Sequence, residues 1–160
     1  MRPVADVDSA PEPSSEFQLD RAAMVYARLA LGSAFLSAVA GRFGIWKGTL
    51  DWTYFERFIH RTAEVNAFMP AFTIPFLAWA ATAAEISCGV ALILGVQLRW
   101  VALASAVLLG MFAVAMTLSL GVKPPLDSSV FSASAGALLL ALRARAARDP
   151  SSRGRVAQDI

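Results

Sequence analysis

The sequence predicts an all-α integral membrane protein, a four-helix bundle with an amphipathic interfacial segment between helices 1 and 2. Apolar residues make up 57% of the 160 residues and charged residues only 16%, whereas soluble domains contain about 45–50% and about 25%. A soluble domain of this size leaves much of its surface in water and cannot hide such an apolar excess. The chain also holds four apolar runs close to the roughly 20 residues that cross a bilayer. Lipid is therefore the predicted surrounding of the helices.

The first elements are a polar lead-in and a first span. Residues 1–20 contain three prolines, several acids and little apolar material, which predicts a disordered N-terminal segment. The first span follows at about residues 22–41 and is interrupted by Arg28. Its end, Ala38-Val39-Ala40, is similar to a signal-peptidase site, but the acids ahead of it are unlike the basic start of a signal peptide. We therefore expect this span to be retained.

The connection after the first span, residues 42–68, mixes aromatic and charged side chains. Within it Trp52, Phe55 and Ile59 recur at helical spacing, with charged residues at other positions. This pattern is typical of an amphipathic helix that lies in the membrane interface. Its aromatic residues fit the belt that such side chains form at the headgroups.

Three more apolar runs complete the predicted transmembrane domain, residues 21–142. They are the second, third and fourth spans, at about residues 72–95, 100–122 and 126–142. Glu85 interrupts the second span, the third has no charged residue, and the fourth is short and rich in serine and alanine. Pro124 and Pro125 separate the third span from the fourth. The Arg-rich residues 143–160 form the predicted tail.

The basic residues outside the spans predict the orientation. With four crossings, both termini lie on one side of the membrane. That side then carries eight basic residues, and the other side, which includes Arg42, carries five. The positive-inside rule therefore places both termini and the tail in the cytoplasm.

Single cysteine and histidine residues exclude several redox centres. Cys88 is the only cysteine and His60 the only histidine, so the chain can form neither an internal disulfide nor a haem site between two histidines. We predict no metal and no intrinsic cofactor, and a redox role must use a borrowed electron carrier such as a quinone. The net charge is only +2, and without a basic patch on the folded part we expect no nucleic-acid partner.

Two charges inside predicted spans are the main site candidates. Arg28 and Glu85 interrupt the first and second spans, and an ionisable group at mid-bilayer costs about 2.5–3.5 kcal/mol on insertion scales unless it is paired or hydrated. The midpoints of two antiparallel spans place both residues at similar depth, which predicts an Arg28–Glu85 ion pair. The pair could simply hold the helices together, or Glu85 could contact a ligand headgroup.

Three residues are secondary candidates. Cys88 lies beside a glycine in the second span, where buried packing and a redox role are the alternatives. His60 lies in the outer connection and is either an interfacial side chain or a ligand contact. Arg99 follows the second span.

Several short motifs, taken together, resemble the DoxX family of small bacterial four-helix membrane proteins. They span about Arg28 to Leu142 and comprise Arg28-Leu-Ala-Leu-Gly32, Glu85-Ile-Ser-Cys-Gly89, Leu94-Gly95 with Arg99, and Ser119-Leu-Gly-Val-Lys-Pro-Pro-Leu-Asp127. The resemblance implies a multi-pass protein of the bacterial cytoplasmic (inner) membrane. It also implies that the intramembrane arginine and glutamate of the family correspond to Arg28 and Glu85, and the arginine after its second span to Arg99.

The resemblance implies a role in redox assemblies. Related DoxD proteins form the membrane subunit of a thiosulfate:quinone oxidoreductase, and other DoxX-like proteins are linked to oxidative-stress complexes. Our first hypothesis is a non-catalytic subunit or accessory of such a quinone-linked complex, with a soluble redox protein or a second copy of the chain as partner. The alternatives are a membrane scaffold that docks soluble partners through the tail, and a small transporter or channel.

Overall fold

The structure is a computed structural model that describes residues 13–147, and within that range the chain is helical and contains no strand. This confirms the predicted all-α class. The helices are, in order, α1 (Pro13–Arg42), η1 (Ile45–Lys47), α2 (Trp52–Val65), η2 (Ala71–Thr73), α3 (Ile74–Leu94), α4 (Leu98–Leu120), α5 (Lys123–Asp127) and α6 (Val130–Ala146).

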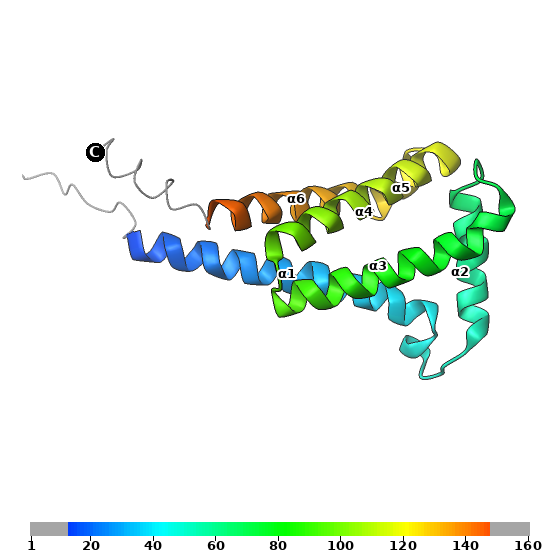
Figure 1. Ribbon diagram of the computed structural model, residues 1–160, viewed down its shortest axis with the longest axis horizontal. Coiled ribbons are helices and arrows are strands. Elements are labelled where there is room, and N and C mark those ends of the chain that lie inside the picture. Colours follow the sequence, from blue (N-terminus) through cyan, green and yellow to red (C-terminus); the bar gives the residue numbers. More distant parts are fainter. Residues whose placement is uncertain (1–12, 148–160) are drawn as a thin grey trace, which may run out of the picture.

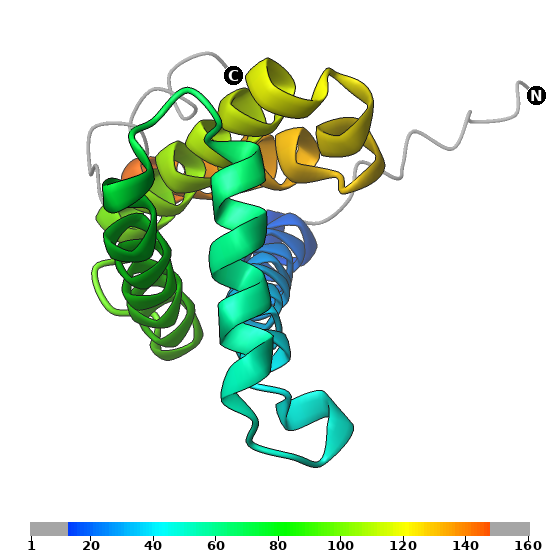
Figure 2. The ribbon, with the colours of Figure 1, turned by 90° about the vertical axis from the view of Figure 1, so that its right-hand side faces the viewer.

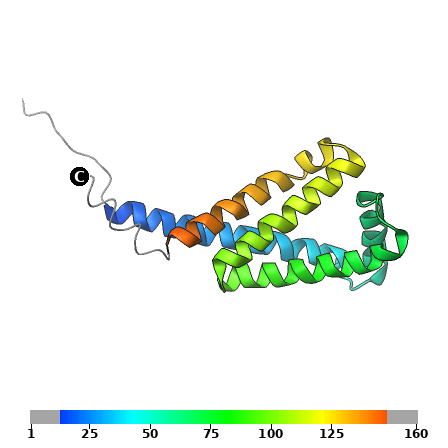
Figure 3. The ribbon, with the colours of Figure 1, turned by 45° about the horizontal axis from the view of Figure 1, so that its top comes forward.

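The long helices form two closely packed pairs. Helix α1 packs along α3, and α4 packs along α6. Figure 1 shows these four helices running roughly side by side, while α2 crosses one end of the bundle (Figures 1 and 2). Helices α3 and α4 leave their common turn and diverge toward the end at which α2 lies (Figure 3). Toward the end at which α3 and α4 share their turn, buried side chains from all four long helices form the core: Phe35, Leu92, Ala102, Leu140 and Ala141.

Three of the helices are long and apolar enough to cross a membrane, namely the segments Phe17–Arg42, Ala71–Leu94 and Leu98–Leu120. Their outer faces are apolar as well. On α4, residues three or four positions apart form an exposed stripe: Leu103, Val107, Met111, Val114 and Leu118. In water such a surface would drive association, whereas lipid tails solvate it. The chain is a membrane protein.

The fourth predicted span differs from the structure. Helix α6 has 17 residues, which correspond to about 25 Å and fall short of the roughly 30 Å of hydrocarbon. It begins at Val130 rather than near residue 126, because Pro124 and Pro125 start the separate short helix α5. Ser129, with a positive φ of 54°, then breaks the chain direction before α6.

The predicted disordered segment 1–20 is wrong for residues 13–20, which are the first turns of α1. Pro13 stands at the start of a helix, where its missing N–H costs nothing, and composition alone did not reveal this. Residues 1–12 lie outside the described part. Of the predicted tail, Arg143 and Arg145 belong to α6, and residues 148–160 lie outside the described part. Arg143 pairs with Asp20 of α1 at 3.2 Å.

The predicted amphipathic helix in the connection is α2. Asp51 caps it, because its carboxylate accepts a hydrogen bond from the Thr53 amide at 2.9 Å, and the bonds to Thr53 lower the pKa of the Asp51 carboxyl. Phe55 is fully buried and its ring lies 4.5 Å from that of Trp79 on α3. Its ring also stacks on that of Phe43, 5.3 Å away. One face of α2 therefore packs against Phe43, which follows α1, and against Trp79 on α3.

Helices α1 and α3 approach each other most closely at two glycines. A Cβ atom on Gly32 would lie 2.9 Å from the carbonyl oxygen of Gly89 and 2.7 Å from Cγ1 of Ile93. A Cβ atom on Gly89 would lie 3.1 Å from the Gly32 carbonyl oxygen. Small residues permit such backbone contact in lipid, where packing holds helices together. The two glycines set the register of α1 against α3.

We expect Gly32→Ala to lower stability by about 1–3 kcal/mol, because the new methyl group overpacks the contact with Gly89 and Ile93. Gly136→Ala is the matched control, since nothing lies within 4 Å of a Cβ atom there and alanine is the better helix former. Thermal unfolding of both variants in the same detergent gives the comparison. Equal melting temperatures for the two variants would contradict the close contact.

Candidate functional site

Glu85 is buried on α3, with only 2% of its surface exposed, and its partner is Arg42. The Arg42 Nη2 atom donates to Glu85 Oε1 at 2.7 Å. The predicted Arg28–Glu85 pair is therefore wrong, because the guanidinium that pairs with Glu85 comes from Arg42. Arg42 is the last residue of α1, and the sequence analysis had assigned it to the outer connection.

Two further contacts hold the Arg42 side chain in place. Its Nη1 atom donates to the Thr82 hydroxyl at 3.1 Å, and that hydroxyl donates in turn to the Ala78 carbonyl at 2.8 Å. The guanidinium carbon lies 3.8 Å from the centre of the Phe58 ring on α2. A cation over an aromatic face is attracted by the ring's quadrupole, and more strongly away from water. Helices α1, α2 and α3 thus jointly fix the charge opposite Glu85.

Arg28 has a different role at the other end of α3. Its Nε and Nη2 atoms donate to the carbonyl oxygens of Leu92 and Ile93, both at 3.0 Å. The last carbonyls of a helix lack partners within the helix and carry partial negative charge. Gly95 ends the helix with a φ of 73°, and a Cβ atom there would lie 2.5 Å from Arg28 Nη2. Arg28 therefore caps α3.

The contact between Gly32 and Gly89 explains why Arg42, and not Arg28, pairs with Glu85. In an antiparallel pair, residues before the crossing point on one helix face residues after it on the other. Arg28 comes four residues before Gly32 and so meets Ile93, four residues after Gly89. Glu85, before Gly89, must face the part of α1 after Gly32. Arg42 reaches it because helical side chains point toward the N-terminus of their own helix.

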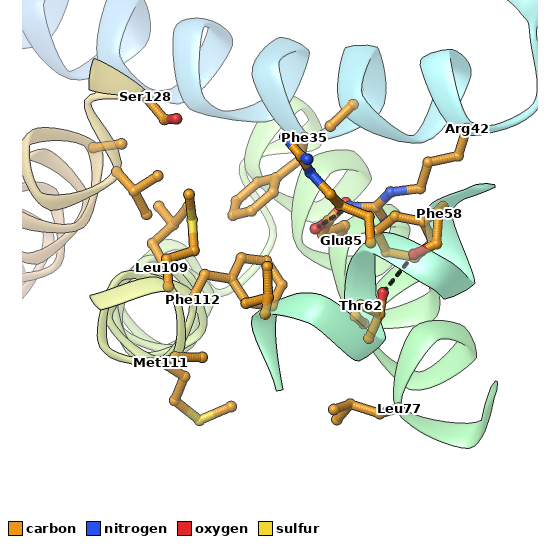
Figure 4. A pocket seen from close by; sticks show the side chains of 18 of the residues that line it. Phe35, Arg42, Phe58, Thr62, Leu77, Glu85, Leu109, Met111, Phe112 and Ser128 are labelled. Atoms are coloured by element: carbon orange, nitrogen blue, oxygen red, sulfur yellow. Dashed lines mark hydrogen bonds and ion pairs between the residues drawn. The ribbon is translucent and has the colours of Figure 1, made fainter. Parts of the chain in front are cut away.

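The Arg42–Glu85 pair borders a cavity of about 430 Å³. The cavity lies between the two helix pairs on the side where α3 and α4 diverge, and α2 contributes residues to its wall. Most of its lining is apolar and includes the rings of Phe35, Phe58 and Phe112. Figure 4 shows these rings, together with Leu109 and Met111, around the space that Glu85 borders. The site is a mostly apolar cavity that is bordered by the Arg42–Glu85 pair and by a second cation, Arg61.

One oxygen of Glu85 is not satisfied. Oε1 accepts the bond from Arg42, but Oε2 is buried and has no hydrogen-bond partner among the described residues. Buried polar atoms are nearly always hydrogen-bonded, and each exception calls for an explanation. Glu85 thus borders the cavity and holds one buried acceptor without a donor among the described residues.

The secondary candidates do not line this cavity. Cys88 is half-buried and packs against the core formed by Phe35 and its neighbours, which agrees with the packing alternative. Arg99 lies over the ring of Trp100, with 4.8 Å between the guanidinium carbon and the ring centre. His60 is exposed on α2 and borders a separate hollow next to the start of α3. Glu85 therefore forms no hydrogen bond or ion pair with any of the four other candidates, Arg28, Arg99, Cys88 and His60.

Sequence reasoning missed Arg42 and the aromatic lining of the cavity. The signal for Arg42 was present in the two glycines, because their contact implies an antiparallel register that excludes Arg28 as the partner of Glu85. No comparable signal existed for Phe35 and Phe112. Phe35 lies on α1 and Phe112 on α4, far apart in the sequence. Only the divergence of α3 and α4 brings both rings to one cavity.

Comparison with known families gives one match. The profile of the family described as DoxX matches residues 23–119, which is more than half of the chain and includes Arg28, Arg42 and Glu85. Neither the curated proteins nor the solved structures contain a match to this chain.

Double-mutant cycles test which arginine interacts with Glu85. Removing one member of a buried pair leaves an uncompensated charge, at a cost of about 3–5 kcal/mol. We expect Arg42→Met and Glu85→Leu to be coupled by more than about 1 kcal/mol, so that the double variant recovers stability. Arg28→Met and Glu85→Leu should be additive within about 0.5 kcal/mol. Unfolding in detergent mixtures measures each term, and coupling of Arg28 to Glu85 would contradict the register.

Proposed function

The chain belongs to the DoxX family, and from this premise we propose that it is a non-catalytic membrane subunit or accessory of a quinone-linked redox complex, acting on sulfur compounds or in oxidative stress. The observation that carries the proposal is the apolar cavity with the Arg42–Glu85 pair at one end. A quinone is a ring with oxygens on an apolar tail, and this cavity offers matching surroundings for each part.

The cavity fits a quinone headgroup in size and lining. Its volume of about 430 Å³ lies in the range of about 300–1,000 Å³ typical of small-molecule sites, which are mostly apolar with a few polar groups that orient the ligand. The rings of Phe35 and Phe112 offer flat apolar surfaces. Leu77 and Met111 line a part of the wall away from Glu85 and suit an apolar tail (Figure 4).

The polar end can bind the headgroup oxygens. A guanidinium has five N–H donors, and Arg42 uses two of its nitrogens for Glu85 and Thr82. A remaining N–H can donate to a carbonyl or hydroxyl oxygen of the ring. A bound quinone supplies the electron-accepting chemistry, whereas the residues of this chain bind and orient the ring. The electrons come from a partner protein, because the chain has one cysteine and one histidine.

We place the protein in the bacterial cytoplasmic membrane with both termini in the cytoplasm. The ion pair of Asp20 with Arg143 brings the end of α6 to the beginning of α1, which supports termini on one side and α6 as a fourth, short crossing. Basic residues gather at that end, with Arg21, Arg99 and Arg145, as the positive-inside rule requires. Helix α2, across the opposite end, then lies in the outer interface.

A cavity-filling substitution tests ligand binding. Ala81 on α3 lines the cavity, whereas its neighbour Ala80 is exposed on the outer face. We expect Ala81→Leu to weaken binding of a decyl-tailed benzoquinone at least tenfold, because the larger side chain occupies the cavity, and Ala80→Leu to leave binding unchanged. Calorimetry on the purified full chain in detergent measures both, and size-exclusion profiles check folding.

Lipid extracts of the purified protein provide an independent check. Quinone that co-purifies with the wild type and the Ala80→Leu variant should be depleted in Ala81→Leu. If the wild type neither retains quinone nor binds the analogue, the quinone-linked role is wrong.

A further inference from the structure

The unsatisfied Oε2 atom of Glu85 constrains the chemistry of the ligand. Held 2.7 Å from the Arg42 guanidinium through its other oxygen, Glu85 is a carboxylate, and a carboxylate only accepts hydrogen bonds. The group that completes the site must therefore donate a hydrogen bond. It must also be uncharged, since Arg42 already balances the charge of Glu85.

The other polar side chains of the cavity wall have partners elsewhere, including Arg61, whose Nη1 atom donates to Glu64 Oε2 at 3.4 Å. The hydroxyls of Thr62 and Ser128 donate to the carbonyl oxygens of Phe58 and Pro124, at 2.8 and 2.9 Å. The Asn66 amide donates to the Thr62 carbonyl at 2.9 Å. None of these groups bonds to Oε2 within the described part of the chain. The donor therefore comes from outside the described residues, and a ligand in the cavity can supply it.

We propose that the cavity binds an uncharged, hydroxyl-bearing apolar molecule whose O–H donates to Oε2 of Glu85. Combined with the proposed function, on which this step rests, the site selects the reduced form of the quinone, the quinol. Both forms can accept a hydrogen bond from Arg42. Only the quinol has hydroxyl hydrogens, whereas a quinone carbonyl would oppose the carboxylate oxygen with a second acceptor and leave Oε2 unsatisfied.

The two redox forms of one molecule provide the test. A decyl-tailed benzoquinone and its hydroquinone have the same ring, tail and size and differ in the hydroxyl hydrogens. We expect the hydroquinone to bind the detergent-purified full chain at least tenfold more tightly under anaerobic conditions, by calorimetry. Equal affinities, or tighter binding of the quinone, would overturn the inference while the proposed function stands. This comparison uses the wild type and does not depend on the folding of a variant.

Glu85→Gln tests whether Glu85 causes the preference. The glutamine carbonyl can still accept from Arg42, while its NH₂ group donates to a quinone carbonyl. We therefore expect the preference for the hydroquinone to disappear or reverse. Glu56→Gln, the same substitution on the exposed side of α2, should keep the wild-type preference. An unchanged preference in Glu85→Gln would overturn the assignment to Oε2.

A third probe separates this inference from the proposed function. A 4-alkylphenol carries a hydroxyl but is not part of a quinone couple. If it binds in a Glu85-dependent way while neither form of the benzoquinone binds, the hydroxyl-donor site is supported and the quinone role is overturned. If none of the three molecules binds, both are overturned.

Discussion

The close contact of α1 and α3 at Gly32 and Gly89 determines most of the structure. A Cβ atom on Gly32 would lie 2.9 Å from the Gly89 carbonyl oxygen, and one on Gly89 would lie 3.1 Å from the Gly32 carbonyl oxygen, so a shift of one helix along the other would lose the contact. This fixed register decides which residues face each other above and below the crossing. It brings Arg28 to the end of α3 and Arg42 to Glu85. The electrostatics of the bundle thus follow from a packing constraint between two residues without side chains.

The two arginines meet different needs of a helix in lipid. Arg28 supplies donors to the terminal carbonyls of Leu92 and Ile93, the first of which also accepts from the Gly95 amide. Arg42 neutralises a carboxylate that would otherwise be costly to bury. It also needs α2, whose Phe58 ring covers the guanidinium. The connection between the first two spans is therefore part of the site as well as a link.

The cavity results from the way the helix pairs are joined. Helices α1 and α3 pack closely, and so do α4 and α6, but the turn that links α3 to α4 lets the two pairs separate toward α2 (Figure 3). The space between them is lined mostly by apolar side chains, and the half-satisfied carboxylate of Glu85 borders it. An ion pair that served only to join α1 to α3 would not require an oxygen left without a donor, which is the reason for our proposal that Glu85 contacts a ligand.

By itself the sequence determined the helical class, the membrane environment and the family, and it singled out Glu85 as a charge inside a predicted span. These depend on composition, on the length of apolar runs and on the cost of a charge in lipid, which act locally along the chain. Only the tertiary structure decided that Arg42 is the partner of Glu85, that Arg28 caps α3, and that Phe35 and Phe112 share a cavity. Those facts depend on register and on the angle between helix pairs. Both are set by contacts between residues distant in sequence. They cannot be derived from the midpoints of the predicted spans.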